Sequence, residues 1–235
     1  MKVGLYHMSI NVLLSSELEK IVKMLYNEHF EILDLYMFSP QLNKLHLINV
    51  ICDILRKDSV PYDDEDIRSA LVELFDNERF RRKFFRTLVI IIKDSGNILA
   101  TDEARLEQAI RTGDIWSFVG IAVKKCLGPK RAYATIPDDF ITGPNTTVQK
   151  IVNGFNSVAK DYKRKEEPLL RCFLHEKFFN KKSRIQKKNL SRVLKNIKSC
   201  FMLVKAKYHD ENAPFDASAQ AVNKFFVAIR REFFK

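Results

Sequence analysis

Apolar side chains recur every three or four residues along most of the chain, which is the spacing of one face of an α-helix. In the first half this pattern predicts helices over residues 16–39, 41–57, 67–75 and 78–93. Proline or clustered polar residues separate these segments, and the acids at residues 63–66 favour a helix start. The periodicity therefore predicts a helical first half.

Local end signals refine several of these boundaries. Ser16 followed by Glu19 has the spacing of a capping box at a helix start. Gly113 is suited to the position just after a helix, and Asp114 to the cap of the next one. The helix expected over residues 115–127 is apolar nearly all round, so we expect it to be the central buried helix.

The second half begins with the longest stretch that lacks periodicity, residues 129–146, which contains three prolines. Helices are expected after it over residues 148–162 and 169–180, followed by a long basic helix capped by Ser183. A final helix is expected to begin after Asp216.

The chain is therefore expected to be all-α, with about ten helices in two packed lobes. The expected division is a first lobe over residues 1–128, a linker over 129–146 and a second lobe over 147–235. Residues 1–14 carry apolar side chains without a helix cap and could form an extended N-terminal arm.

Composition agrees with a helical globular protein. The chain has 46% hydrophobic residues, enough for a substantial core, and this excludes the disordered classes. Its 7 glycines and 7 prolines among 235 residues provide too few turns for a β-sandwich or barrel.

Several features bear on the cellular compartment. The first 15 residues lack the apolar segment of a secretory signal, and no stretch approaches the length of a membrane-spanning helix. Cys52, Cys126, Cys172 and Cys200 are far apart and form no CxxC pair, so we expect reduced thiols in helical cores. We therefore expect an intracellular, cytoplasmic protein, with the nucleus left open.

Charge is distributed unevenly along the chain. The net charge is +11, yet residues 1–100 carry −2, residues 101–128 carry 0, and residues 129–235 carry +13 from 23 basic and 10 acidic side chains. Residues 181–198 contain eight basic side chains and no acid. A field of one sign attracts polyanions, so the expected partners are nucleic acid, an anionic membrane surface or an acidic protein.

The long basic helix separates into two faces. One is an apolar stripe of Leu190, Leu194, Ile197, Phe201 and Val204. The other holds Arg184, Lys188, Arg192 and Lys195, with Lys181, Lys182, Lys187 and Lys198 nearby. Like charges at i, i+4 destabilise a helix, and no acid is interleaved to offset them, so we interpret this face as a polyanion-binding surface. The alternative is an ordinary solvated, lysine-rich face.

A second, arginine-rich stripe is formed by Arg79, Arg82, Lys83 and Arg86. Arginine makes two parallel hydrogen bonds to phosphate, which suits a nucleic-acid contact. The alternative is an amphipathic helix whose cations pair with the upstream acids Glu73, Asp76 and Glu78. The two interpretations are left open.

If both stripes bind one strand, the lobes would form a groove with the linker at its floor. Lys130, Arg131 and Tyr133 would then supply two cations and a stacking ring. The phenylalanines beside the cations are expected in the core, so Tyr133, Tyr162 and Tyr208 are the better stacking candidates.

Catalytic signatures are absent from the sequence. The five histidines have no metal-ligand spacing, and no GxSxG, Walker A or GxGxxG motif occurs. Pro137-Asp138 with Asp161-Tyr162-Lys163 echoes a metal-dependent nuclease, but Asp161 falls on an expected helix, so we attribute the match to chance. We therefore expect no catalytic residue, metal or cofactor.

The preferred hypothesis is a non-enzymatic protein that binds RNA or another single-stranded nucleic acid without sequence preference. In size, basicity and two-lobed helical pattern it is similar to small viral nucleocapsid proteins, although no motif of a particular nucleoprotein family is present. The hypothesis includes packaging or protection of the strand, and the apolar termini favour a homo-oligomer. The arm or the apolar final helix would dock on a neighbouring copy, unless both fold back on their own core.

The alternative function is a helical adaptor that docks an acidic protein or an anionic membrane.

Overall fold

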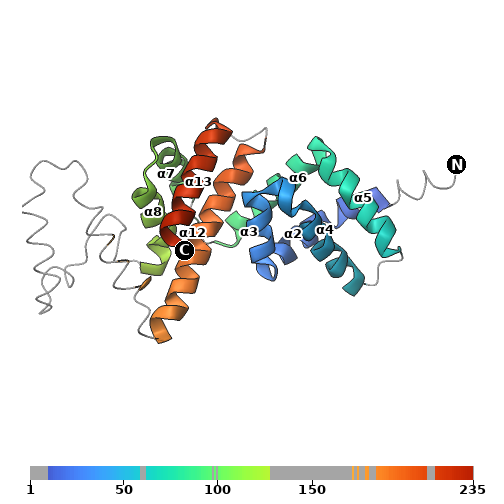
Figure 1. The fold of residues 1–235 in the computed structure, drawn as a ribbon, viewed down its shortest axis with the longest axis horizontal. Helices are drawn as coiled ribbons and strands as arrows, with labels where there is room; N and C mark the ends of the chain where they lie inside the picture. The colour runs from blue at the N-terminus through green and yellow to red at the C-terminus, as the bar shows by residue number, and fades with distance from the viewer. Residues whose placement is uncertain are drawn as a thin grey trace, which may run out of the picture. The chain divides into compact units, whose positions relative to one another are not determined.

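The structure is a computed structural model, and it describes residues 10–58, 62–96, 98, 100–127, 171, 174, 178–179, 184–210 and 215–234. Every regular element in these residues is a helix, and the helices pack against one another (Figure 1). The all-α prediction is therefore confirmed.

The chain divides into two compact units. The first is Met1–Asn97 with Phe201–Asp216, and the second is Ile98–Cys200 with Ala217–Lys235. Helix α12 (Arg184–Tyr208) is continuous across this division and contributes residues to both units. The expected linker at 129–146 lies outside the described residues, so a lobe boundary there stays a prediction.

Five helices build most of the first unit: α2 (Leu18–Asn27), α3 (Phe30–Phe38), α4 (Pro40–Lys57), α5 (Asp64–Asp76) and α6 (Glu78–Asp94). Helix α2 packs against α3, α4 and α6, while α5 packs against α4 and α6. Asn77 caps α6 by accepting a hydrogen bond from the backbone N–H of Phe80 at 3.2 Å. The expected break between two helices at this asparagine is confirmed.

The first unit has an aromatic core. Phe84 is fully buried, and its ring lies 5.4 Å from that of Phe75 and 6.0 Å from that of Tyr36. Phe85 and Phe80 extend the cluster along α6. Burial raises the pKa of Tyr36 to about 12. The phenylalanines beside the cations of α6 are therefore core residues, as expected from the sequence.

The start of the described chain differs from the expectation. Residues 10–16 are helical, not extended, and Ile10 and Leu14 are buried. The expected capping box does not form, because the Ser16 hydroxyl donates to the Leu13 carbonyl at 2.8 Å. Burial of Ile10 and Leu14 explains both differences, because apolar packing can stabilise a short helix that has no sequence cap.

The second unit contains α7 (Ala100–Thr112), α8 (Ile115–Leu127), α13 (Ala219–Phe233) and the first part of α12. Gly113 has φ +69° after α7, and the Asp114 side chain accepts from the backbone N–H of Ser117 at 3.1 Å. Phe118 and Val123 of α8 are fully buried. Both end signals and the burial of this helix are confirmed.

Helix α13 folds back on its own unit. It packs against α7 and α8, and Phe225 lies 5.1 Å from Phe118, ring to ring. Its cap is the Ser218 hydroxyl, which accepts from the backbone N–H of Ala221 at 3.2 Å, so the expectation of Asp216 as cap is wrong. Because Phe225 and Phe226 are buried here, the main apolar face of this helix is used internally.

Candidate nucleic-acid interface

Helix α12 is the most one-sided element in charge. Its 25 residues include eight lysines and arginines and no acid. Lys187, Lys188, Arg192 and Lys195 are exposed. We call these four residues the cation face. Lys181 and Lys182 lie outside the described residues, and the side chain of Arg184 is not described.

The apolar stripe of α12 is buried over most of its length. Ile197, Phe201 and Val204 are at most 1% exposed, as the spacing predicts. Leu190 and Leu194, nearer the start of the helix, are only half-buried. The helix is therefore anchored by its later turns, while its first turns hold cations and partly open leucines.

One edge of the cation face approaches the end of α8. The amide nitrogen of Asn196 donates to the Cys126 sulfur at 3.2 Å. Burial raises the pKa of the Cys126 thiol, although the nearby Arg192 guanidinium opposes this effect. Arg192 therefore has a neighbour within the protein, whereas Lys187 and Lys188 extend from the exposed side of α12.

The second stripe, on α6, is partly used within the protein. Arg82 pairs with Glu78 at 2.7 Å, and Lys83 donates to the Ser15 carbonyl at 3.2 Å. Arg79 and Arg86 are exposed. The pairing of Arg82 favours the amphipathic-helix interpretation for that residue, so two exposed arginines remain as candidate phosphate contacts in the first unit.

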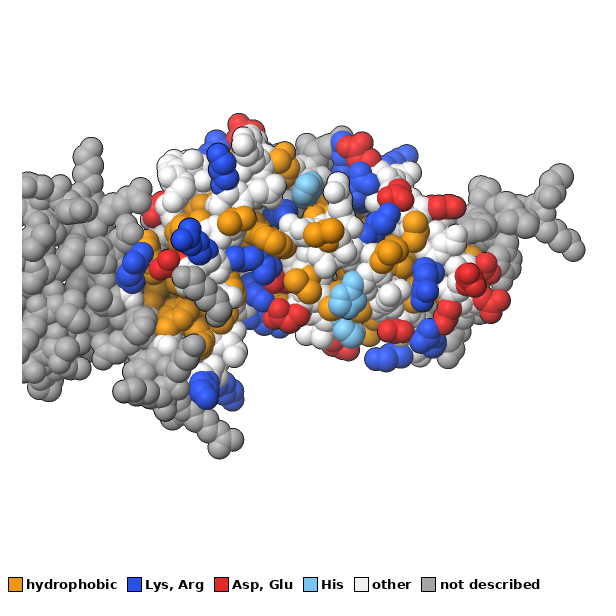
Figure 2. Space-filling view, in the orientation of Figure 1, with side chains coloured by type: hydrophobic (Ala, Val, Ile, Leu, Met, Phe, Trp, Pro, Cys, Tyr) orange, Lys and Arg blue, Asp and Glu red, His pale blue; other side chains and the backbone are white. Residues whose placement is uncertain are grey.

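Charges elsewhere in the first unit are mixed. Lys44 pairs with Asp76 at 2.7 Å, Lys20 pairs with Asp58 at 2.8 Å, and Arg56 lies between two aspartates. Figure 2 shows this contrast, because blue and red side chains alternate over α4 and α5, whereas only blue ones mark the lower end of α12. The cation face is therefore not the usual surface of this protein.

Most of the remaining candidate residues cannot be placed by the described part of the chain. Lys130, Arg131, Tyr133 and Tyr162 lie outside the described residues, so the groove that would join both stripes stays a prediction. Tyr208 is half-buried, with its ring 5.2 Å from that of His209. That packing leaves Tyr208 less suited to stacking on a base than the sequence suggested.

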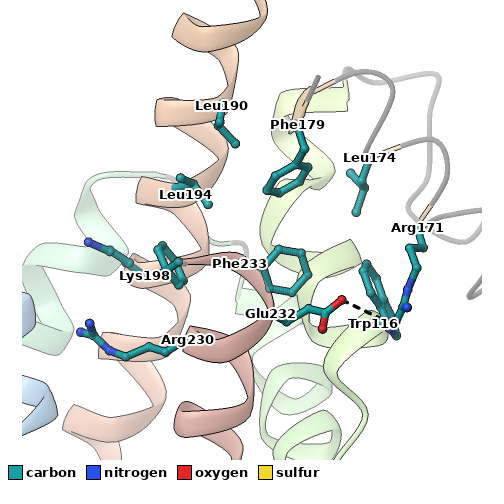
Figure 3. Close-up of a pocket in the computed structure, with 11 residues that line it drawn as sticks. Trp116, Arg171, Leu174, Phe179, Leu190, Leu194, Lys198, Arg230, Glu232 and Phe233 are labelled. Atoms are coloured by element: carbon teal, nitrogen blue, oxygen red, sulfur yellow. Dashed lines mark ion pairs between the residues drawn. The ribbon is translucent and has the colours of Figure 1, made fainter. Parts of the chain in front are cut away.

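Helix α12 also lines a cavity that no sequence pattern indicated (Figure 3). Its described walls come from α8, α12 and α13, together with Arg171, Leu174 and Phe179. Because these segments are far apart in the chain, no periodicity could bring them together. The sequence places Leu190 and Leu194 in a buried apolar stripe, whereas in the structure both line this cavity.

The described residues give little support for a metal site or for a nucleophilic cysteine. No group of three or more His, Cys, Asp and Glu side chains there could hold a metal ion. Cys52, Cys126 and Cys200 are free thiols, and burial raises the pKa of each, which disfavours the nucleophilic thiolate. Cys172 lies outside those residues.

Among the helices that the structure describes, none combines the length and the apolar character needed to span a bilayer.

No family model matches the sequence, and neither the curated proteins nor the solved structures include one that is significantly similar to it.

Proposed function

We propose that this protein binds single-stranded nucleic acid, RNA in the first instance, through the cation face of α12. The observation that carries the proposal is the 25-residue helix with eight basic and no acidic side chains, four of whose cations form an exposed face. A nucleic-acid strand presents phosphates at regular intervals, and lysine and arginine side chains neutralise them.

Helix energetics support a functional role for this face. Lys188, Arg192 and Lys195 are spaced by four and three residues, so like charges are neighbours on the helix surface. Each such pair destabilises an isolated helix by a few tenths of a kcal/mol, and a Glu at any intervening surface position would relieve it. A bound polyanion removes the same repulsion.

Contacts made to phosphate through charge carry no sequence information. Lys187 and Lys188 are point charges on flexible stems, which suit an irregular single strand better than a fixed groove. The proposed activity is therefore binding without base preference and without catalysis.

Salt dependence tests this proposal. The double variant Lys188→Gln/Arg192→Gln should flatten the dependence of log affinity on log salt by about 1.4, because each single-strand phosphate contact contributes about 0.7. Fluorescence anisotropy with a labelled oligouridylate at several salt concentrations measures the slope. Far-UV circular dichroism should show unchanged helix content.

A matched control removes the same charge elsewhere. Lys23 and Lys57 are exposed on α2 and α4, and the variant Lys23→Gln/Lys57→Gln should keep the wild-type slope. An equal change in both double variants would mean that net charge alone controls binding, and an unchanged slope in the α12 variant would move the site elsewhere. Tighter binding to anionic vesicles than to the oligonucleotide would favour the membrane-surface alternative.

Packaging is a further step that requires self-association. The apolar face of α13 is occupied within its own unit, and Ile10 and Leu14 are buried, so neither supplies a ready contact between copies. We expect any RNA-dependent assembly to depend on residues 1–9 or on other surfaces. Light scattering of residues 1–235 and 10–235, with and without RNA, measures it. Monomers in every sample would contradict packaging but not binding.

A further inference from the structure

The cavity beside α12 has the size of a ligand site. Its volume is about 620 Å³, within the usual range for pockets that hold small organic groups. The described side chains that line it all belong to the second unit, and Figure 3 shows Leu190 and Leu194 on α12 opposite Phe179 and Phe233. It is therefore a built hollow between helices of one compact unit.

Aromatic rings dominate one wall. Trp116 contacts Phe233 edge to face, with ring centroids 5.3 Å apart, and Phe179 lies 5.6 Å from Phe233. Phe179 and Phe233 are only half-buried, so part of each ring borders the cavity. Half-covered ring faces at this spacing favour a flat apolar ligand, which can stack on one ring while it contacts another.

Cations surround the aromatic wall. Among the described residues that line the cavity, Arg171, Lys198 and Arg230 are cations and Glu232 is the one acid. The Arg171 guanidinium lies 4.5 Å from the Trp116 ring centroid and 3.6 Å from the Glu232 carboxylate. Because the cations outnumber the acid three to one, the rim favours a ligand that joins its flat apolar part to an anionic group.

The same helix holds the cavity wall and the cation face. Leu190, Leu194 and Lys198 line the cavity, and they alternate along α12 with Lys188, Arg192 and Lys195. Lys188 and Lys198 are ten residues apart, about 15 Å along the helix axis. A strand whose phosphates follow the cation face therefore passes within reach of the cavity.

We propose that this cavity receives an unstacked base of the same strand, held against Phe179 and Phe233 while Lys198 faces its phosphate. This inference rests on the proposed function and adds a second element to it, base stacking beside phosphate contact. A long-chain carboxylate would also match an apolar cavity with a cationic rim. The aromatic wall and the continuity with the cation face favour the nucleobase.

The single tryptophan of the chain, Trp116, provides the readout because it lines this cavity. The full-length protein is titrated with an oligouridylate and with an abasic oligonucleotide of equal length, which has the phosphates but no bases. We expect both to bind, but only the oligouridylate to change Trp116 fluorescence. Its affinity should be higher by about 5- to 150-fold for each stacked base.

Two variants of α13 distinguish the loss of a ring in the cavity wall from the loss of a ring in the core. Phe233→Leu removes a ring from the cavity wall, whereas Phe225→Leu removes a buried ring that packs on Phe118 and does not line the cavity. Phe233→Leu should lower the affinity ratio of oligouridylate to abasic strand at least fivefold, and Phe225→Leu should leave the ratio unchanged. Using a ratio cancels any shared loss of folded protein.

The outcomes distinguish the two proposals. If neither oligonucleotide binds, the proposed function and this inference both fail. If both bind equally and Trp116 fluorescence is constant, the phosphate-binding function stands and the base site is overturned. If oleate changes Trp116 fluorescence and the oligouridylate does not, the cavity is a site for apolar carboxylates and the base site is likewise overturned.

Discussion

Phe84→Ala should lower the free energy of unfolding by about 3–5 kcal/mol, the usual loss when a buried phenylalanine is truncated. Phe84 is fully buried, and its ring contacts those of Tyr36, Phe75 and Phe85 at centroid distances of 5.4 to 6.0 Å. Its removal leaves a cavity that three rigid rings cannot close. Urea unfolding followed by far-UV circular dichroism measures the change.

An exposed leucine in the same unit is the control. Leu42 of α4 is 85% exposed, so Leu42→Ala should change the free energy of unfolding by no more than about 0.5 kcal/mol. A loss below about 1 kcal/mol for Phe84→Ala would mean that the aromatic cluster is loosely packed, contrary to its geometry.

Helix boundaries were predictable where the signal is local. Gly113 with Asp114 fixed the end of one helix and the start of the next, because a positive φ and a capping carboxylate act within one turn. The boundary at Asn77 was found for the same reason. At the start of α13 the expected cap Asp216 was two residues too early, because the Ser218 hydroxyl makes the capping hydrogen bond.

Burial that depends on contacts between distant segments was harder to predict from the sequence. Lys205 and Lys207 near the end of α12 were grouped with the basic excess, yet both are buried. Lys205 donates to the Phe38 carbonyl at 3.3 Å, at the end of α3, where the last carbonyls have no partner within the helix. That partner lies 167 residues away, so no periodic pattern could indicate it.

The candidate site likewise has one part that the sequence predicts and one that it does not. The cation face was predictable because an absence of acids and a four-residue spacing are properties of one helix. The cavity was not, because its rings and cations come from segments between Trp116 and Phe234. Leu190 and Leu194 belong to the same apolar stripe as fully buried residues, so the sequence does not show that they are only half-buried.

We expect His209 to make the stability of the protein depend on pH. Burial, with smaller contributions from Lys205 and Arg81, lowers the pKa of His209 to about 4, and its ring stacks on Phe85 at 4.6 Å. Above about pH 6.5 the imidazole is neutral in both the folded and the unfolded chain. Between about pH 6.5 and pH 4 the unfolded chain binds a proton that the folded chain does not, so stability falls as pH falls.

The lowered pKa limits this effect to about 3 kcal/mol across that window. His209→Phe keeps a ring against Phe85 but has no proton to bind, so it should flatten the fall in urea midpoint between about pH 7 and pH 4.5. His46→Gln is the matched control, because His46 is exposed on α4 and its replacement should leave the pH profile unchanged. Equal profiles for the wild type and His209→Phe would show that His209 is protonated in the folded protein, and that charge is tolerated beside Lys205 and Arg81.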